Sequence, residues 1–110
     1  MAAMTARHET IKPAHPGEHL REDYIPALKR AGVTLSGLAR NLRTSRNNLN
    51  LILDARRGVS PEMAVKLAAV FPHTTPEFWA NMQSNHDLWL ARKTVDTSGI
   101  TAVAVGQQAV

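Results

Sequence analysis

Two short stripes of apolar residues, both lying between Thr34 and Asp54, form the most informative pattern in this chain. The first stripe recurs at i, i+3, i+4 and i+7, as on one face of a helix, and comprises Leu35, Leu38, Ala39 and Leu42. The second has helical spacing as well and comprises Leu49, Ile52 and Leu53. Thr34 and Ser45 precede the two stripes and can cap the helices. With a tight turn near Arg43 and Thr44, the pattern predicts a helix-turn-helix whose second helix reads DNA.

One helix is predicted before this pair. It begins at Pro16 or Gly17, because proline suits the first turn of a helix, and it ends at Gly32, which tolerates a left-handed backbone. Pro26 lies inside its apolar pattern and is expected to kink or split the helix at Tyr24 to Ile25.

Two further helices are predicted after the pair. Ser60 followed by a proline is a strong helix start, and Pro72 stops that helix. Thr75 followed by a proline repeats the signal for a last helix that ends near residues 92–93. The sequence therefore predicts an all-α, five-helix domain over residues 16–93.

The first of these two helices is expected to bury one face, which comprises Met63, Ala64, Leu67, Ala68 and Phe71. Most of the large apolar residues of the last helix are expected to lie in the core as well: Phe78, Trp79, Met82, Leu88 and Trp89. Two tryptophans on one terminal helix exceed what a small bundle must bury. Aromatic residues are also enriched at protein interfaces. Part of the last helix could therefore face a second subunit or another protein.

The two ends of the chain lack helical periodicity. Residues 1–15 are expected to form a flexible lead-in, and Met4 is an alternative start. Residues 94–110 carry one charge, Asp96, and include the alternating, largely β-branched stretch from Ile100 to Val105. This tail is expected to be disordered, or to form a short strand if it finds a sheet edge or a second copy of itself.

Composition excludes several classes of function. The chain of 110 residues has no cysteine, so disulfide frameworks, thiolate zinc sites and cysteine nucleophiles are ruled out. It has neither an apolar run of ~20 residues nor a secretory signal, so a soluble cytoplasmic protein with no membrane partner is expected. Neither HExxH, GxSxG nor a glycine-rich phosphate loop occurs. We therefore predict no metal, no cofactor and no enzymatic activity.

The positive charge is concentrated around the helix-turn-helix. Residues 40–57 hold five arginines and one acid, so this stretch accounts for 5 − 1 = +4, which equals the net charge of the whole chain. The guanidinium group suits phosphates and guanine edges better than an ammonium group does. A solvated basic face is the alternative explanation, but its coincidence with a helix-turn-helix pattern favours nucleic acid.

We expect the site residues to fall into two groups. The outward face near the start of the reading helix should contact bases through Ser45, Arg46, Asn47 and Asn50. The surrounding residues should contact phosphates and supply affinity without sequence choice: Arg40, Arg43, Thr44, Arg56 and Arg57.

Taken together, the residues from about 15 to 91 resemble one known family, the HigA-type antitoxins of the XRE-like (Cro/repressor-type) helix-turn-helix group. The resemblance rests on the opening His15-Pro16-Gly17-Glu18, on Ser45-Arg46 and Arg56-Arg57-Gly58, and on Pro76-Glu77-Phe78-Trp79 with Met82-Gln83 and Asp87-Leu88. It implies a lambda repressor-like DNA-binding fold. It also implies an antitoxin of a type II toxin–antitoxin module, which neutralises a HigB-type mRNA-cleaving toxin and represses its own operon as a homodimer on palindromic operator DNA.

Two departures from the family pattern leave alternatives open. Arg43 stands at the turn position usually taken by glycine, so this residue must either adopt or avoid a positive φ at some cost. Leu35 stands where the family often has a glutamine that contacts DNA. One alternative is a stand-alone repressor without a toxin. Another is a protein-interaction module that no longer binds DNA.

Overall fold

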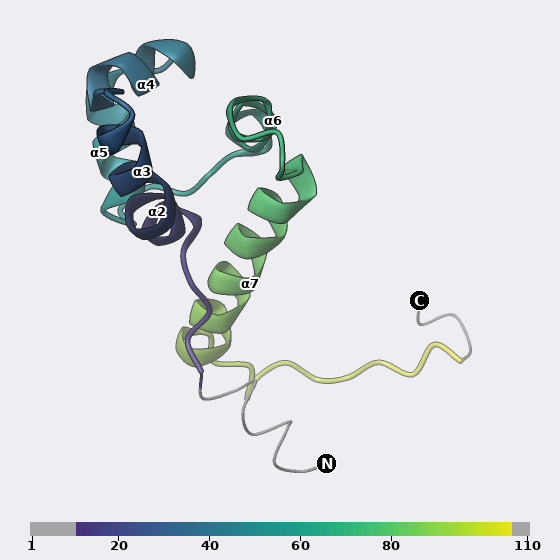
Figure 1. Cartoon of the computed structure of the whole chain (residues 1–110). Helices are drawn as coiled ribbons and strands as arrows, with labels where there is room; N and C mark the ends of the chain where they lie inside the picture. The colour runs from purple at the N-terminus through teal and green to yellow at the C-terminus, as the bar shows by residue number, and fades with distance from the viewer. Residues whose placement is uncertain (1–10, 107–110) are drawn as a thin grey trace.

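Residues 11–106 are described by a computed structural model, and over this range the chain forms helices and no strand (Figure 1). Three segments run end to end as one helical stretch: α2 (Pro16–His19), η1 (Leu20–Tyr24) and α3 (Ile25–Arg30). Four helices follow: α4 (Leu35–Asn41), α5 (Arg46–Leu53), α6 (Pro61–Val70) and α7 (Pro76–Thr94). The described part of the chain therefore confirms the predicted all-α domain of five helical stretches. The first ten and last four residues, which include most of the expected lead-in, lie outside the described range.

The expected break before Pro26 is present as a π-helical turn. The N–H of Ile25 donates to the carbonyl of Leu20, five residues back, which closes η1. Pro26 then occupies the first turn of α3, where its missing N–H breaks no hydrogen bond. The helical stretch therefore continues through the proline to Arg30.

Helices α3, α4 and α5 end in the same way, with one residue in left-handed backbone conformation. These residues are Gly32 (φ 83°), Arg43 (φ 53°) and Ala55 (φ 59°). After each of them, the next N–H donates to a carbonyl five residues back, as in a Schellman motif. Only the first of the three uses glycine. Arg43 therefore adopts a positive φ rather than avoiding it, which costs an L-residue about 1–2 kcal/mol.

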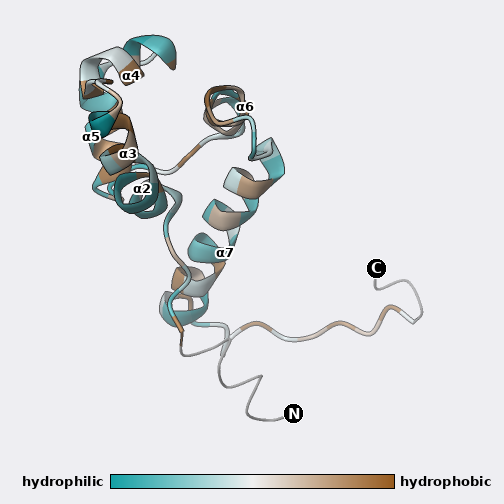
Figure 2. Ribbon diagram, viewed as in Figure 1, coloured by the Kyte–Doolittle hydropathy of each residue, from teal (hydrophilic) through white to brown (hydrophobic). Residues whose placement is uncertain are grey.

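The core is formed by buried residues from all five helical stretches, and Trp79 is one of its largest members. Trp79 is fully buried, and its indole N–H donates to the Thr74 hydroxyl at 2.9 Å. The predicted stripes of α4 and α5 are buried apart from Leu35, which packs against the core while partly exposed. Figure 2 shows α6 as hydrophobic over most of its visible turns. The expectation that most apolar residues of α7 are core is wrong for Phe78 and Leu88, which are 39% and 47% exposed.

Figure 1 shows how the helices are grouped. The stretch from α2 to α5 gathers on one side, α6 and α7 lie on the other, and residues 54–60 connect the two groups. α2 lies against both α5 and α7, so the first helix joins the groups. Beyond α7, the chain from Val95 to Gly106 extends away from the helices as neither helix nor strand.

Candidate nucleic-acid interface

Helix α5 presents its polar residues outward because its apolar ones face the core. The Ser45 hydroxyl accepts the Asn48 N–H at 2.9 Å, which caps the helix as predicted. The four residues predicted to contact bases are all exposed on α5 and its cap: Ser45, Arg46, Asn47 and Asn50. The structure therefore brings this group together on one accessible surface.

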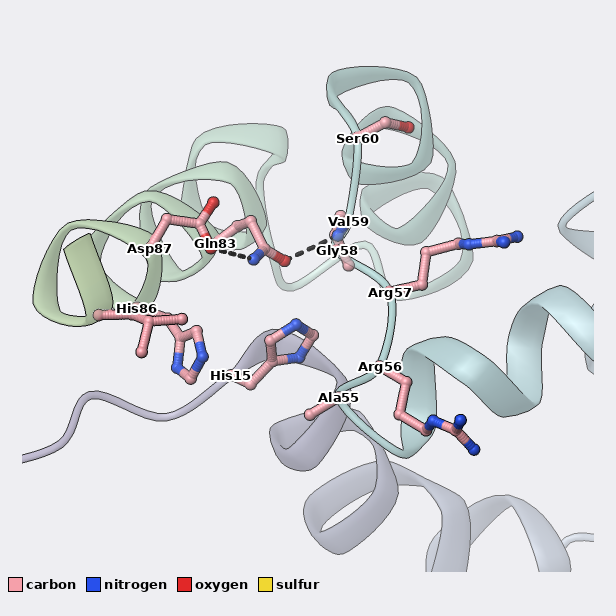
Figure 3. Close-up of a pocket in the computed structure, with 11 residues that line it drawn as sticks. His15, Ala55, Arg56, Arg57, Gly58, Val59, Ser60, Gln83, His86 and Asp87 are labelled. Atoms are coloured by element: carbon pink, nitrogen blue, oxygen red, sulfur yellow. Dashed lines mark hydrogen bonds between the residues drawn. The ribbon is translucent and has the colours of Figure 1, made fainter. Parts of the chain in front are cut away.

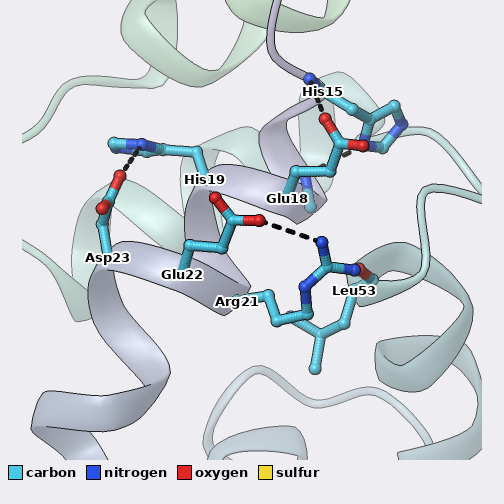
Figure 4. A network of polar contacts seen from close by, with 8 residues as sticks. His15, Glu18, His19, Arg21, Glu22, Asp23 and Leu53 are labelled. Carbon is cyan, nitrogen blue, oxygen red and sulfur yellow. Dashed lines mark hydrogen bonds and ion pairs between the residues drawn. The ribbon is translucent and has the colours of Figure 1, made fainter.

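The first helical stretch packs against α5 and contacts two of its main-chain carbonyl oxygens. A Cβ on Gly17 would lie 1.6 Å from the carbonyl oxygen of Ile52, so only glycine allows α2 to approach this closely. Arg21 donates to the carbonyl of Leu53 at 2.9 Å and so satisfies an acceptor at the end of α5 (Figure 4). These two contacts from the first helical stretch therefore hold α5 without involving its outward side chains.

His15 fixes the start of α2 in this arrangement. The residue is buried, and its ring Nδ1 accepts the backbone N–H of Gly17 at 2.9 Å. The backbone N–H of His15 donates to the Glu18 carboxylate at 3.2 Å (Figure 4). Burial, followed by the nearby His86 ring, lowers the pKa of His15 below its usual value. The neutral ring, which can accept the N–H, is therefore the form that the fold favours.

The residues predicted to contact phosphates flank α5 at both ends. Arg40 and Arg43 come from the end of α4 and the turn, and Arg56 and Arg57 follow the end of α5. All four arginines are exposed, whereas Thr44 is half-buried. Positively charged side chains therefore lie beside both ends of α5, where they could neutralise the phosphates of a bound duplex.

Asn48 links the two ends of this surface and was not predicted from the sequence. Its side-chain amide donates to the Thr44 hydroxyl at 2.8 Å, and its amide oxygen accepts from the guanidinium of Arg57. The spacing of Thr44 and Asn48, four residues apart at a helix start, could have indicated the first contact. The second depends on the path of the loop after α5, which no local pattern reveals.

Arg46 is tied to α4 by a hydrogen bond from its guanidinium to the Ser36 hydroxyl at 3.0 Å. A guanidinium carries five N–H donors, so this bond leaves donors for a base edge. Ser36 follows Leu35, whose own side chain packs against the core. The first turn of α4 thus supports the reading helix through Ser36.

The loop that carries Arg56 and Arg57 borders an open depression of about 460 Å³ against α7 (Figure 3). Gln83 fixes the loop there, since its side-chain oxygen accepts the Val59 N–H at 2.7 Å and its amide donates to Asp87 at 2.9 Å. In Figure 3 the two arginine side chains extend from the loop away from His15. Gln83 therefore holds the loop against α7, and the side chains of Arg56 and Arg57 remain exposed.

Residues 11–106 show neither a candidate metal centre nor a candidate membrane span. Within residues 11–106, the acidic and histidine side chains form no group of three or more that could hold a metal ion. No helix in this range is long and apolar enough to cross a membrane.

Comparison with known proteins adds independent findings, although no family model matches the chain. An uncharacterized HTH-type transcriptional regulator of Haemophilus influenzae is 44% identical over 80 residues, which cover 73% of this chain and 71% of the relative. Antitoxin HigA-1 of Vibrio cholerae is 33% identical over 81 residues, which cover 74% and 72%.

The solved structures of similar fold include two antitoxins. Antitoxin HigA of Pseudomonas aeruginosa with the higBA promoter matches with a TM-score of 0.64 and 37% identity, over 74% of this chain and 84% of the other. Antitoxin GraA in complex with its operator matches with a TM-score of 0.70 and 37% identity, over 87% and 95%. All four relatives are named as regulators or antitoxins, and none as an enzyme.

Proposed function

Since the chain belongs to the XRE-like helix-turn-helix family of HigA-type antitoxins and transcriptional regulators, we propose that it is an operator-binding antitoxin. As a homodimer it represses its own operon in the cytoplasm, and it neutralises a HigB-type mRNA-cleaving toxin. The outward face of α5 is the observation that carries the first part of this proposal. Two relatives of similar fold are described with promoter or operator DNA, which supports the same assignment.

Base recognition falls to the first turns of α5. The guanidinium of Arg46 suits the two acceptors of a guanine edge, and the amides of Asn47 and Asn50 suit adenine. All three side chains are exposed and lie near the start of the helix, which is the end that this motif inserts into the major groove. Ser45 completes the group, although its hydroxyl oxygen also accepts the capping hydrogen bond.

Affinity falls to the arginines that flank α5. With Arg40, Arg43, Arg56 and Arg57 each neutralising one phosphate, the logarithm of the affinity should fall with the logarithm of salt concentration with a slope of about −3.6 per chain. Thr44 adds a neutral contact, and Asn48 holds both Thr44 and Arg57 in place.

The two departures that favoured a module without DNA binding are accommodated by this fold. Arg43 closes a Schellman turn with its side chain exposed, and Leu35 packs against the core while Ser36 supports Arg46. Neither residue obstructs the outward face of α5. The geometry therefore favours DNA binding over the pure interaction module.

The test of DNA binding is a titration of the protein with a duplex from its own promoter and with a scrambled duplex, followed by fluorescence anisotropy. Arg46→Ala should weaken operator binding by about 1–3 kcal/mol and relax the choice of one base pair. Arg92→Ala, which removes an exposed arginine from the end of α7, is the matched control and should change neither. Equal weakening of both duplexes by Arg46→Ala would contradict base contact.

The toxin is tested separately from the operator. A short reading frame next to the gene should encode a protein that stops growth when expressed alone and is harmless when expressed together with this chain. Affinity purification of the chain from that co-expression should recover the toxin. Operator binding without a neighbouring toxin would instead identify a stand-alone repressor.

A further inference from the structure

The guanidinium of Arg46 is held by a neutral group rather than by an acid. Its Nη1 donates to the Ser36 hydroxyl at 3.0 Å, and within residues 11–106 this is the one hydrogen bond that the guanidinium makes. The ion pairs among these residues do not include Arg46. A carboxylate partner would neutralise the guanidinium and compete with DNA for it, whereas a hydroxyl can orient the group and leave its charge intact.

Ser36 lies on a part of α4 that is fixed on both sides. The preceding Leu35 packs against the core, and the Thr34 hydroxyl accepts the N–H of the following Gly37 at 3.0 Å. α4 itself packs against α5 (Figure 1). The Ser36 hydroxyl is therefore carried by a short side chain on a rigid helix, and such a group can hold a long, flexible side chain in place.

The bond to Ser36 leaves the other edge of the Arg46 guanidinium free. The N–H donors on Nε and Nη2 lie on the edge away from Nη1, and together they match the O6 and N7 acceptors of guanine. An arginine that nothing holds loses rotamer freedom when a base fixes it, and it can turn towards a phosphate instead. A guanidinium that is already oriented loses less of this freedom when it meets a guanine.

We propose that Ser36 is a positioning residue for operator recognition, which orients the guanidinium of Arg46 towards a guanine and so sharpens the choice of that base pair. This inference rests on the proposed function, in which Arg46 contacts a base. Both side chains are exposed in the free protein, where water competes for their hydrogen bond, so the bond adds little to stability. In a groove that excludes water the same bond is stronger. Ser36 therefore contributes to specificity and not to affinity for DNA in general.

Fluorescence anisotropy with the full-length protein measures this specificity as a ratio of two dissociation constants. The first is for an operator in which the G·C pair read by Arg46 is replaced by A·T, and the second is for the operator itself. That pair is the one at which Arg46→Ala relaxes the choice of base. The wild-type ratio should be about 5 to 150, as for one bidentate contact.

Ser36→Ala should lower the ratio at least about threefold, the effect of losing one hydrogen bond, and leave the dissociation constant for a scrambled duplex unchanged. Ser36→Thr keeps the hydroxyl and should restore the wild-type ratio. Ser84→Ala, which removes an exposed serine from α7, is the matched control and should change neither quantity. In the Arg46→Ala protein, Ser36→Ala should change the ratio no further, because Ser36 acts only through the arginine.

Several results would overturn the positioning role and leave the proposed function intact. These are a wild-type ratio in Ser36→Ala, additive losses in the double variant, or equal weakening of operator and scrambled DNA, which would place the hydroxyl on a phosphate. Thermal unfolding of Ser36→Ala should stay within about 3 °C of wild type. A larger loss would make the hydroxyl a structural group and would also count against the proposal. A wild-type protein that binds both duplexes equally well would instead contradict the proposed function.

Discussion

Arg43 carries two opposing properties that a single substitution separates. Its backbone is left-handed at φ 53°, and its exposed guanidinium belongs to the proposed phosphate contacts. An L-residue in this conformation is disfavoured by about 1–2 kcal/mol, whereas glycine is not. Glycine, however, loses an additional 0.5–1 kcal/mol or so of chain entropy on folding. Arg43→Gly should therefore raise the free energy of unfolding by about 0.5–1 kcal/mol.

Thermal unfolding followed by circular dichroism measures this gain, which corresponds to a rise in Tm of about 2–6 °C for a domain of this size. Arg43→Gly should also weaken binding to all DNA sequences and reduce the salt slope by about one, because one cation is lost. Arg43→Ala is the matched control, since it loses the same charge but keeps a Cβ in the left-handed conformation. Ala55→Gly repeats the backbone effect at φ 59° without a change of charge.

The three variants separate the possible outcomes. If Arg43→Gly and Arg43→Ala unfold at the same temperature, the backbone at this turn is not under the stated penalty. If Ala55→Gly stabilises the fold and Arg43→Gly does not, the arginine side chain contributes a contact that offsets the penalty. If the salt slope is unchanged in both Arg43 variants, the guanidinium does not contact phosphate.

Three further predictions concern contacts around α5. Gly17→Ala should prevent α2 from seating or lower Tm by well over 10 °C, as measured by circular dichroism, because its Cβ would lie 1.6 Å from the carbonyl oxygen of Ile52; a Tm near that of wild type would refute the close approach. The pKa of His15 is lowered in the fold, so the neutral ring is favoured, and stability from this residue is present above about pH 6.5 and declines as pH falls below it. His15→Asn, which can still cap α2, should flatten the dependence of Tm on pH between about 7 and 5. Asn48→Ala should weaken binding to operator and scrambled DNA alike, because Arg57 loses its support; an effect confined to the operator would indicate a base contact instead.

Local signals explain which parts of this fold are predictable. Thr34, Ser45, Ser60 and Thr75 each cap the helix that follows them, as their residue types predict, and each accepts an N–H within three residues of itself. The buried residues of α5 follow one helical stripe, so the spacing of its apolar residues is enough to assign the opposite, outward face. The α5 residues proposed to contact bases follow from that same spacing, whereas the arginines proposed to contact phosphates follow from the concentration of positive charge in residues 40–57.

Long-range contacts explain the rest. Gly17 meets Ile52 and Arg57 meets Asn48 only after the chain has folded back, so no spacing rule reveals them. Helix α7 is hard to assign for another reason. Its apolar residues occur all around the helix rather than on one stripe, and the pattern does not distinguish the buried Trp79 from the exposed Phe78 and Leu88.

The contacts that the first helical stretch makes with α5 suggest how such a protein can acquire a new operator. Gly17 packs against the carbonyl oxygen of Ile52, and Arg21 donates to that of Leu53. Neither contact involves an outward side chain of α5. Exchange of Asn47 or Asn50 therefore leaves the docking angle of the helix as it was. Paralogues that differ at these positions could therefore bind different operators with the same scaffold. A designer could change the operator preference by replacing only the outward-facing residues of α5.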